Sequence, residues 1–168
     1  MAAATIEHFT SQLEAIDRAI GETIDQDAEL RGRRELLLSV IGVGETLAAL
    51  LMAEMPEIGT LSNKAISKLA GVAPLARDSG KHQGKRAVRG GRAAVREILF
   101  VVAGVAGRYE PDFMAFQQRL RAAGKPPKVV RIALAHKLLV RLNAKAREVR
   151  QSMLDFQPVS SPLLLGTK

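Results

Sequence analysis

The most informative segment for the fold is residues 41–51, with the sequence Ile41-Gly42-Val43-Gly44-Glu45-Thr46-Leu47-Ala48-Ala49-Leu50-Leu51. An apolar residue, a Gly-x-Gly turn and then small and large apolar residues at helical spacing predict a helix-hairpin-helix over residues 36–55. The amides at the start of the second helix can bind a backbone phosphate without reading sequence, which makes Gly42 and Gly44 candidate nucleic-acid contacts. A plain helix–helix turn, with glycines for packing, is the alternative interpretation.

The rest of the chain is also patterned as helix. Residues 5–30 place apolar side chains at steps of three and four, which predicts one helix before Gly32 loosens the chain. Further helices are expected over 62–70, 92–108 and 111–122, and from Pro126 or Pro127 to about 153, and no stretch alternates like a strand. We therefore expect an all-α fold in three parts: a coiled-coil-like helical arm at 1–34, a helical domain at 35–155 and a flexible tail at 156–168.

Composition excludes several classes of protein. The 168 residues include no cysteine, and the three histidines are scattered, so neither a disulfide nor a metal site is expected in this chain. No apolar run approaches the ~20 residues of a membrane span, and the N-terminal residues lack the pattern of a signal peptide. The expectation is a cytoplasmic protein with no cofactor and no membrane partner.

Charge divides the chain into two unequal parts. Residues 1–60 carry 4 basic and 11 acidic side chains, whereas residues 61–168 carry 21 basic and 6 acidic ones, a local net charge of +15. A basic field of that size attracts polyanions at long range, so nucleic acid is the leading partner. A solvated Lys/Arg surface without a partner is the alternative.

Residues 71–92 form the least regular stretch, and Ser79 lies within it in the sequence Arg77-Asp78-Ser79-Gly80. A serine hydroxyl becomes a nucleophile when a neighbour takes its proton, and phosphoryl transfer needs positive charge around the phosphate oxygens. Ser79 is therefore a candidate nucleophile toward a phosphodiester, although an ordinary Asp-Ser-Gly turn is the simpler interpretation from spacing alone. The candidate nucleic-acid contacts in and just after this loop are Arg77, Lys85, Arg86, Arg89, Gly90, Gly91, Arg92 and Arg96.

The last predicted helix adds a regular series of cations. Lys137, Arg141 and Lys145 are spaced by four residues, which predicts one exposed basic stripe. Lys137 and Arg141 are further candidate contacts to nucleic acid.

An ordered set of motifs resembles the C-terminal domain of transposases of the insertion-sequence-110 family. The set comprises Gly-Val-Gly (42–44), Gly-Val-Ala-Pro (71–74), Arg-Asp-Ser-Gly (77–80), Gly-Gly-Arg (90–92) with Arg96, Arg-Ala-Ala-Gly-Lys-Pro (121–126) and Lys-Leu-Leu-Val-Arg-Leu-Asn-Ala (137–144). The resemblance covers roughly residues 34–148, and the helix at 5–30 resembles the end of the coiled-coil arm that precedes this domain.

The resemblance implies a chemistry and a set of partners. Ser79 would be the nucleophile that forms a covalent phosphoserine link to DNA, and a structured non-coding RNA would guide the choice of target. The active site would be shared between protomers, with homo-oligomers formed through residues 5–30. Divalent metal would belong to an N-terminal RNase H-like domain with an acidic tetrad. The protein would be bacterial and associated with the nucleoid.

Two departures from the family pattern matter. The metal-binding domain is absent from these 168 residues, and position 136 is His where relatives usually have Arg. We therefore expect little recombinase activity from this chain alone, and whether it is an enzyme is left open. The alternatives are a truncated transposase that binds nucleic acid or regulates without catalysis, and an unrelated helix-hairpin-helix protein of DNA repair.

Overall fold

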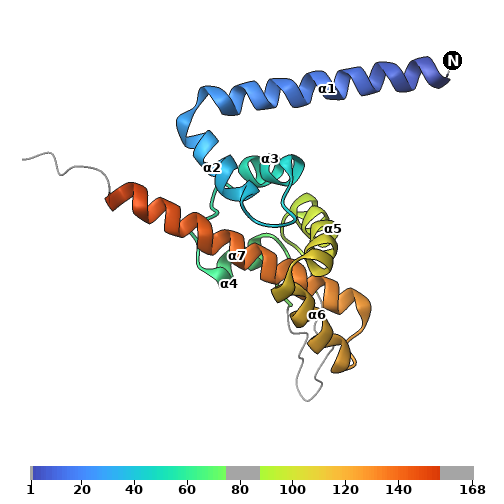
Figure 1. Cartoon of the computed structure of the whole chain (residues 1–168), viewed down its shortest axis with the longest axis vertical. Helices are drawn as coiled ribbons and strands as arrows, with labels where there is room; N and C mark the ends of the chain where they lie inside the picture. The colour runs from blue at the N-terminus through green and yellow to red at the C-terminus, as the bar shows by residue number, and fades with distance from the viewer. Residues whose placement is uncertain (1, 75–87, 156–168) are drawn as a thin grey trace, which may run out of the picture.

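A computed structural model describes residues 2–74 and 88–155 (Figure 1), and these residues form seven helices and no strand. The helices are α1 (Ala2–Gln26), α2 (Ala28–Leu38), α3 (Glu45–Glu54), α4 (Asn63–Leu69), α5 (Ala93–Tyr109), α6 (Pro111–Ala122) and α7 (Pro127–Asp155). The predicted all-α class is confirmed. The tail expected at 156–168 lies outside the described residues.

The core is built around α7, which packs against α2, α4, α5 and α6. It presents an apolar stripe to this core, because Val130, Leu134, Leu138 and Leu142 are spaced at helical intervals and are all buried. The hairpin helix α3 completes the core from the other side with Leu47, Ala48 and Leu51, and it leans on α5. Leucine and other aliphatic side chains dominate this core, as the scarcity of aromatic residues leads one to expect.

The N-terminal arm differs from the single helix expected over residues 5–30. The helix breaks at Asp27, whose carboxylate accepts hydrogen bonds from the amides of Glu29 (2.7 Å) and Leu30 (3.1 Å) and so caps a new helix. The chain then continues as α2 through Gly32, which does not interrupt it. A capping carboxylate contributes about 1 kcal/mol to starting a helix, which is comparable to what one glycine costs inside it. The sharp bend between α1 and α2 is plain in Figure 1.

Other predicted helix ends are confirmed. Ser62 caps α4 by accepting a hydrogen bond from the amide of Ala65 (3.3 Å), and Gly71 follows that helix with a φ of +68°. Pro111 occupies the first turn of α6, where its missing N–H costs nothing.

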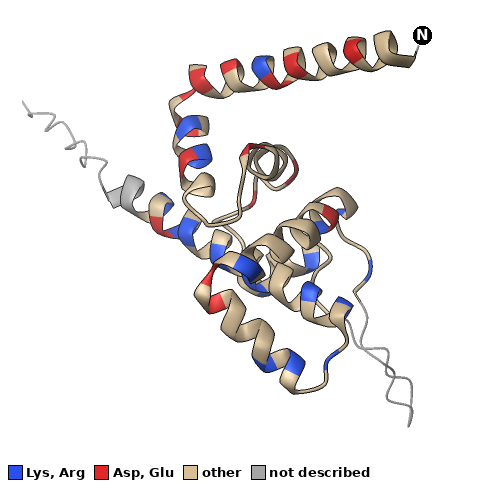
Figure 2. Ribbon diagram, turned by 45° about the vertical axis from the view of Figure 1, so that its right-hand side comes forward, with Lys and Arg blue, Asp and Glu red and all other residues tan. Residues whose placement is uncertain are grey.

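Charge is distributed over the folded chain much as it is along the sequence. Acidic side chains predominate on α1, whereas Lys and Arg predominate on α4 to α7 (Figure 2). The arm and the body therefore present opposite charges to their surroundings.

Candidate nucleic-acid interface

The predicted hairpin forms between α2 and α3. The amide of Val43 donates to the carbonyl of Val40 (3.0 Å), and Gly42 adopts a φ of +89° that only glycine accommodates readily. A Cβ on Gly42 would stand 3.5 Å from Ala106, an ordinary contact, so backbone conformation rather than space requires the glycine. Gly44 is the N-cap of α3 and is exposed, with no side chain capping the helix. A turn between two helices thus forms where it was predicted, and its role as a helix-hairpin-helix that binds nucleic acid stays a prediction.

The charges around the hairpin are already paired. Arg34 makes two hydrogen bonds to the carboxylate of Glu45 (2.8 and 2.9 Å) and one to Asp25 (3.1 Å). The hydrogen bond from Arg34 lowers the pKa of Glu45 and, reciprocally, Glu45 raises the pKa of Arg34. With two acids and one cation at this turn, phosphate binding by Gly42 and Gly44 stays a prediction that rests on backbone amides alone.

A crossing of two backbone segments lies where the predicted loop 71–92 begins and ends. The amide of Arg92 donates to the carbonyl of Leu69 (2.9 Å). A Cβ on Gly91 would stand 2.4 Å from the nitrogen of Gly71, and a Cβ on Gly71 would stand 2.2 Å from the carbonyl oxygen of Gly90. We call this contact of residues 69–71 with 90–92 the glycine crossing. It brings the two ends of the intervening segment together.

Part of the predicted site lies within that segment. Residues 75–87, which include Ser79, Arg77, Lys85 and Arg86, lie outside the described residues. The structure therefore fixes the two ends of this segment at the glycine crossing and tests none of these four predictions.

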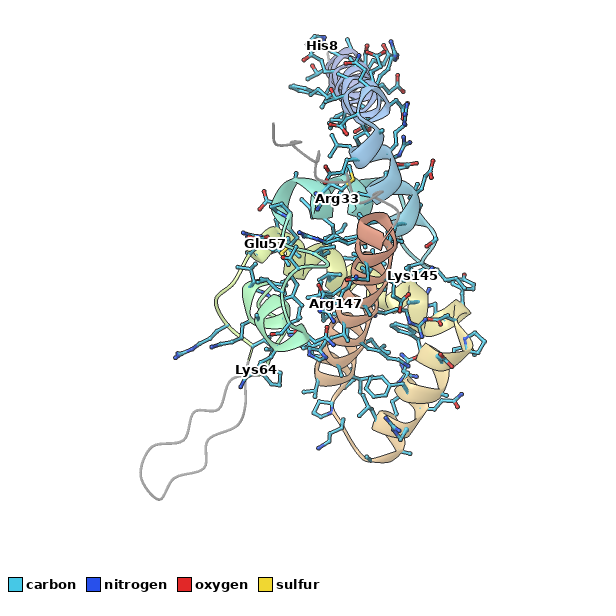
Figure 3. The ribbon with its side chains drawn as sticks, turned by 90° about the vertical axis from the view of Figure 1, so that its left-hand side faces the viewer. His8, Arg33, Glu57, Lys64, Lys145 and Arg147 are labelled. Carbon is cyan, nitrogen blue, oxygen red and sulfur yellow. The ribbon has the colours of Figure 1, made fainter. Side chains whose placement is uncertain are left out.

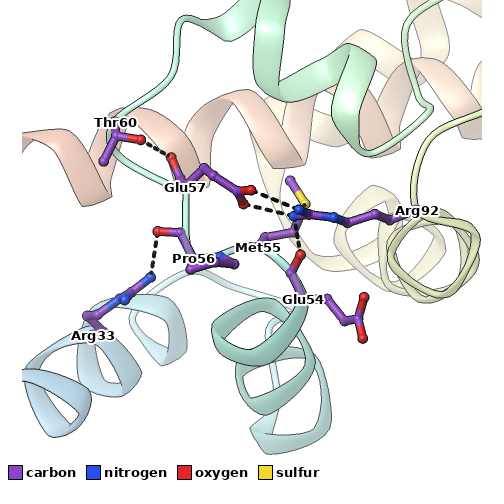
Figure 4. Close-up of polar contacts among 7 residues, drawn as sticks. All are labelled: Arg33, Glu54, Met55, Pro56, Glu57, Thr60 and Arg92. Atoms are coloured by element: carbon purple, nitrogen blue, oxygen red, sulfur yellow. Dashed lines mark hydrogen bonds and ion pairs between the residues drawn. The ribbon is translucent and has the colours of Figure 1, made fainter.

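Arg92 ties the glycine crossing to the turn that follows α3. Its guanidinium makes a two-pronged ion pair with Glu57 (2.8 Å each) and also bonds to the carbonyl of Glu54 and the sulfur of Met55 (Figure 4). The hydrogen bond from Arg92, followed by one from the backbone amide of Glu57, lowers the pKa of the Glu57 carboxyl to about 2. Predicted as a phosphate contact, Arg92 has its charge matched within its own chain.

Arg96 serves the same crossing. Its guanidinium donates to the carbonyl of Gly90 (2.6 Å) and lies against Gly71. Gly90 and Gly91 have φ values of +70° and +68°, so both occupy the left-handed region. Two predicted phosphate contacts, Arg96 and the Gly90-Gly91 pair, are thus brought together, and the described residues give both a structural role.

Three exposed cations flank the crossing without a carboxylate partner among the described residues: Arg89, Lys64 and Lys68. Arg89 was predicted, whereas the two lysines of α4 were not (Lys64 is labelled in Figure 3). Their signal was present in the sequence, because they are four residues apart in the short helix that leads directly to Gly71. Two lysines in a helix of seven residues form too short a pattern to predict a charged surface.

The basic stripe predicted on α7 is half-buried, because its cations bind other parts of the chain, and contact of Lys137 and Arg141 with nucleic acid stays a prediction. Lys137 donates to the carbonyl of Asp112 (2.8 Å) and lies over the ring of Phe113. Arg141 is ion-paired with Glu110 and, at 3.0 Å, with Asp112. Because all these partners belong to the start of α6, the two cations fasten α6 to α7. Lys145 likewise donates to the hydroxyl of Ser39 at the end of α2 (2.8 Å).

Asn143, in the motif at residues 137–144, is a buried polar residue whose role the sequence did not predict. Its side-chain oxygen accepts from the amide of Gly59 (2.9 Å), and its nitrogen donates to the carbonyl of Leu61 (3.0 Å) and the side chain of Asn63 (2.9 Å). It thereby holds the turn at 57–63 against α7. His136, also on α7, is half-buried, and burial lowers its pKa.

No metal centre is evident in the part of the chain that the structure describes. Residues 2–74 and 88–155 contain no group of three or more His, Asp or Glu side chains placed to hold a metal ion. They therefore do not fit an acidic metal-binding tetrad. No helix within these ranges is long and apolar enough to cross a membrane.

These features define an all-helical domain in which Lys and Arg outnumber Asp and Glu. The model of the transposase IS116/IS110/IS902 family matches residues 34–118, and the chain belongs to this family, matching its C-terminal domain. It is 33% identical over 150 residues to the pilin gene-inverting proteins of Moraxella bovis and Moraxella lacunata, covering 86% of this chain and 46% of each relative. It is 32% identical over 158 residues to an uncharacterized 42 kDa protein of insertion element IS900 from Mycobacterium paratuberculosis, covering 88% of this chain and 39% of that protein. The chain thus spans less than half the length of these relatives.

Proposed function

We propose that this chain is the DNA-binding, serine-bearing domain of a transposase, with Ser79 as the nucleophile of DNA strand exchange. Membership of the transposase family supports this role, and so do the relatives whose names describe gene inversion, which is a recombination of DNA. The observation that carries the proposal is the glycine crossing. It holds both ends of the Ser79 segment together at one place in a strongly basic body.

The proposed chemistry is a direct transfer of a DNA phosphodiester to serine. The Ser79 hydroxyl oxygen attacks a backbone phosphorus while its proton passes to a base. The bond from that phosphorus to one deoxyribose oxygen breaks, and this oxygen leaves as a hydroxyl. The resulting phosphoserine link retains the phosphodiester for rejoining to another strand.

Cations near the crossing have a defined task in this proposal. Arg89, Lys64 and Lys68 are exposed and pair with no described carboxylate, so they are available to phosphate oxygens. Arg92 and Arg96 act indirectly, because their guanidinium groups bind other parts of the chain and stabilise the glycine crossing. Positive charge placed in advance stabilises the developing charge of phosphoryl transfer without reorganisation.

Fluorescence anisotropy with duplex DNA over a series of salt concentrations tests DNA binding by this chain. Affinity should fall on a log–log plot with a slope of about −0.9 for each phosphate neutralised. Charge-removing variants Lys64→Gln with Lys68→Gln should flatten this slope, whereas Ser79→Ala should leave it unchanged, since a hydroxyl neutralises no phosphate. Absence of binding at low salt would overturn the proposal.

Ser79 itself is tested by cleavage. Because no acidic tetrad fits the described residues, we expect the purified chain alone to leave supercoiled DNA intact. Nicking or relaxation that depends on Ser79 would contradict this expectation and would show that the chain is a complete enzyme.

A regulatory role is the second candidate function. Its motive is the helical arm α1, which leaves a long apolar stripe without a partner among the described residues. A regulator should change the transposition frequency of a co-expressed full-length relative even when it carries Ser79→Ala. A catalytic domain acting in trans should lose its effect with that substitution.

The remaining partners are proposed from the family resemblance. A structured RNA would guide the choice of DNA target, and tighter binding to such an RNA than to duplex DNA in the same salt series would support it. Homo-oligomers formed through residues 5–30 would complete a shared active site.

A further inference from the structure

The stretch from Phe113 to Arg147 has an unusual charge composition. It contains nine Lys and Arg residues and no Asp or Glu. A pair of surface helices normally carries both positive and negative side chains, so a run of this length without one acid is unusual.

Five of the nine cations lie on α7 and contact other elements of the protein, whereas Arg119 lies over the ring of Phe116 within its own helix. Arg131 stacks on Phe100, Lys137 and Arg141 bond to the start of α6, Lys145 bonds to Ser39, and Arg147 donates to the carbonyl of Leu61 (2.8 Å). These side chains are half-buried, apart from Arg147, and they join α7 to its neighbours.

The other four cations gather at the turn between α6 and α7. Arg119, Arg121, Lys125 and Lys128 are all exposed, and none forms an ion pair with a carboxylate in the described ranges. Figure 2 shows the end of α6 and the connecting turn in blue, with red only at the opposite end of α6. We call these four residues the basic tip.

The backbone of the basic tip is held in one conformation. Gly124 has a φ of +70°, its amide donates to the carbonyl of Arg121 (2.9 Å), and the amide of Lys125 donates to the carbonyl of Leu120 (3.1 Å). Pro126 and Pro127 then restrict the chain as α7 begins. A preorganised turn loses less conformational entropy on binding than a mobile one. The exposed start of α7 adds the positive end of a helix dipole.

We propose that the basic tip is a second phosphate-binding surface, which grips the backbone of duplex DNA independently of the glycine crossing. This inference rests on the proposed function and names where, outside the Ser79 region, the domain holds its substrate. Lys125 and Lys128 neutralise phosphates as point charges, and neither side chain is required by the fold. Because phosphate contacts carry no sequence information, the tip positions the domain on DNA without selecting a site.

The test compares two double variants of the full chain by anisotropy with a duplex DNA over a salt series. Lys125→Gln with Lys128→Gln removes two charges from the basic tip. Arg18→Gln with Arg150→Gln removes two exposed charges from α1 and from the far end of α7, as a matched control. The tip variant should flatten the log–log salt slope by about 1.8, whereas the control should change it by less than about 0.5.

Affinity should change in the same direction. If the affinities of the two proteins converge near 1 M salt, the tip variant should bind about 60-fold more weakly than the unsubstituted chain at 0.1 M salt. The loss should be equal on a duplex of shuffled sequence. Circular dichroism should show unchanged helix content, since both lysines are exposed.

The outcomes separate this inference from the proposed function. If the unsubstituted chain binds duplex DNA and the tip variant keeps its slope, the basic tip is not a contact and the proposed function stands. A loss confined to a structured RNA would assign the tip to RNA and overturn the inference. If the unsubstituted chain does not bind duplex DNA at all, both proposals fall.

Discussion

Asn143 shows how much of this fold depends on one buried amide. All of its hydrogen-bonding partners lie in residues 59–63, more than 75 positions earlier in the chain, and the residue is fully buried. The backbone it meets at Gly59 is so close that a Cβ there would stand 2.9 Å from Ala146. This amide therefore stands in for secondary structure, because it pairs the backbone groups of a turn that has no helix of its own.

Replacing Asn143 with Ala should lower the free energy of unfolding by about 1–3 kcal/mol, because it leaves the buried amide of Gly59 without a partner. Urea unfolding followed by circular dichroism measures this loss. Asn63→Ala, which removes only the side-chain partner at the surface, is the control and should cost less. Equal midpoints for Asn143→Ala and the unsubstituted protein would contradict this account.

The ion pair of Glu57 with Arg92 makes stability depend on pH. The pKa of Glu57 is about 2 in the folded protein, below its ordinary value of 4.5, so its contribution is fully present above about pH 4.5 and is lost as pH falls toward 2. Glu57→Gln should therefore unfold at lower urea than the unsubstituted protein at pH 7, with the difference shrinking between pH 4.5 and 2. Glu54→Gln is the control and should have a smaller effect, because the side chain of Glu54 acts on Arg92 through charge alone and makes no hydrogen bond to it. A difference that is constant with pH would count against the pair.

Among the elements, the glycine crossing allows two energetic costs of replacing a glycine to be measured separately. One is the cost of a positive φ, and the other is the cost of a steric clash. Gly90 and Gly91 have nearly the same φ, but a Cβ on Gly90 would meet nothing within 4 Å, whereas one on Gly91 would collide with the backbone of Gly71. Gly90→Ala should thus cost about 1–2 kcal/mol of unfolding free energy from conformation alone. Gly91→Ala should cost roughly 2–5 kcal/mol, since overpacking is added. Thermal unfolding of the two variants, side by side, measures the difference.

The opposite order of stability would show that the two segments do not cross at Gly91. If the proposed function holds, Gly91→Ala should also weaken any reaction that depends on Ser79 in the full-length enzyme, beyond its effect on unfolding. Gly90→Ala should weaken that reaction less, because a Cβ on Gly90 meets nothing within 4 Å and leaves the close approach to Gly71 undisturbed.

Most elements were predictable because their signals are local. The Gly-x-Gly turn, the serine cap of α4 and the apolar stripe of α7 each reside in a few neighbouring residues. The break at Asp27 was missed because the chain is helical on both sides of it, and the capping carboxylate is one of several acids in this stretch. Periodicity reports which face is apolar and says little about where the axis bends.

Partners of the cations were not predictable, because they are distant in sequence. Arg92 meets Glu57 and Arg141 meets Glu110, separations of about thirty residues that only the fold brings together. Charge spacing alone therefore could not separate the cations that fasten helices, such as Lys137, from the exposed ones, such as Lys128. The structure distinguishes the two groups. It favours the basic tip and the lysines of α4, rather than the α7 stripe, as candidate phosphate contacts.

In the molecule as a whole, α1 is the helix whose apolar side chains remain exposed in a single copy. It is a helix of 25 residues whose apolar stripe is exposed from Ile6 to Ile20 and buried only at Ile24, and it stands apart from the body in Figure 1. The exposed side chains of this stripe are Ile6, Phe9, Leu13, Ile16 and Ile20. Near the body the stripe continues into an apolar groove of about 470 Å³ between α1 and α3. A stripe of this size in water indicates an interaction surface.

We expect this arm to associate with the arm of a second copy, burying the stripe of each. Sedimentation velocity should give a mass of at least a dimer for the unsubstituted chain, and Leu13→Glu with Ile16→Glu should return it to a monomer, because each charge would have to be buried in the interface. Glu14→Gln with Glu22→Gln, away from the apolar stripe on the same helix, is the matched control and should leave the mass unchanged. Both arm variants should keep the helix content of the body, since neither Leu13 nor Ile16 belongs to the core. A monomer for the unsubstituted chain at every concentration would show that the stripe needs a partner other than itself.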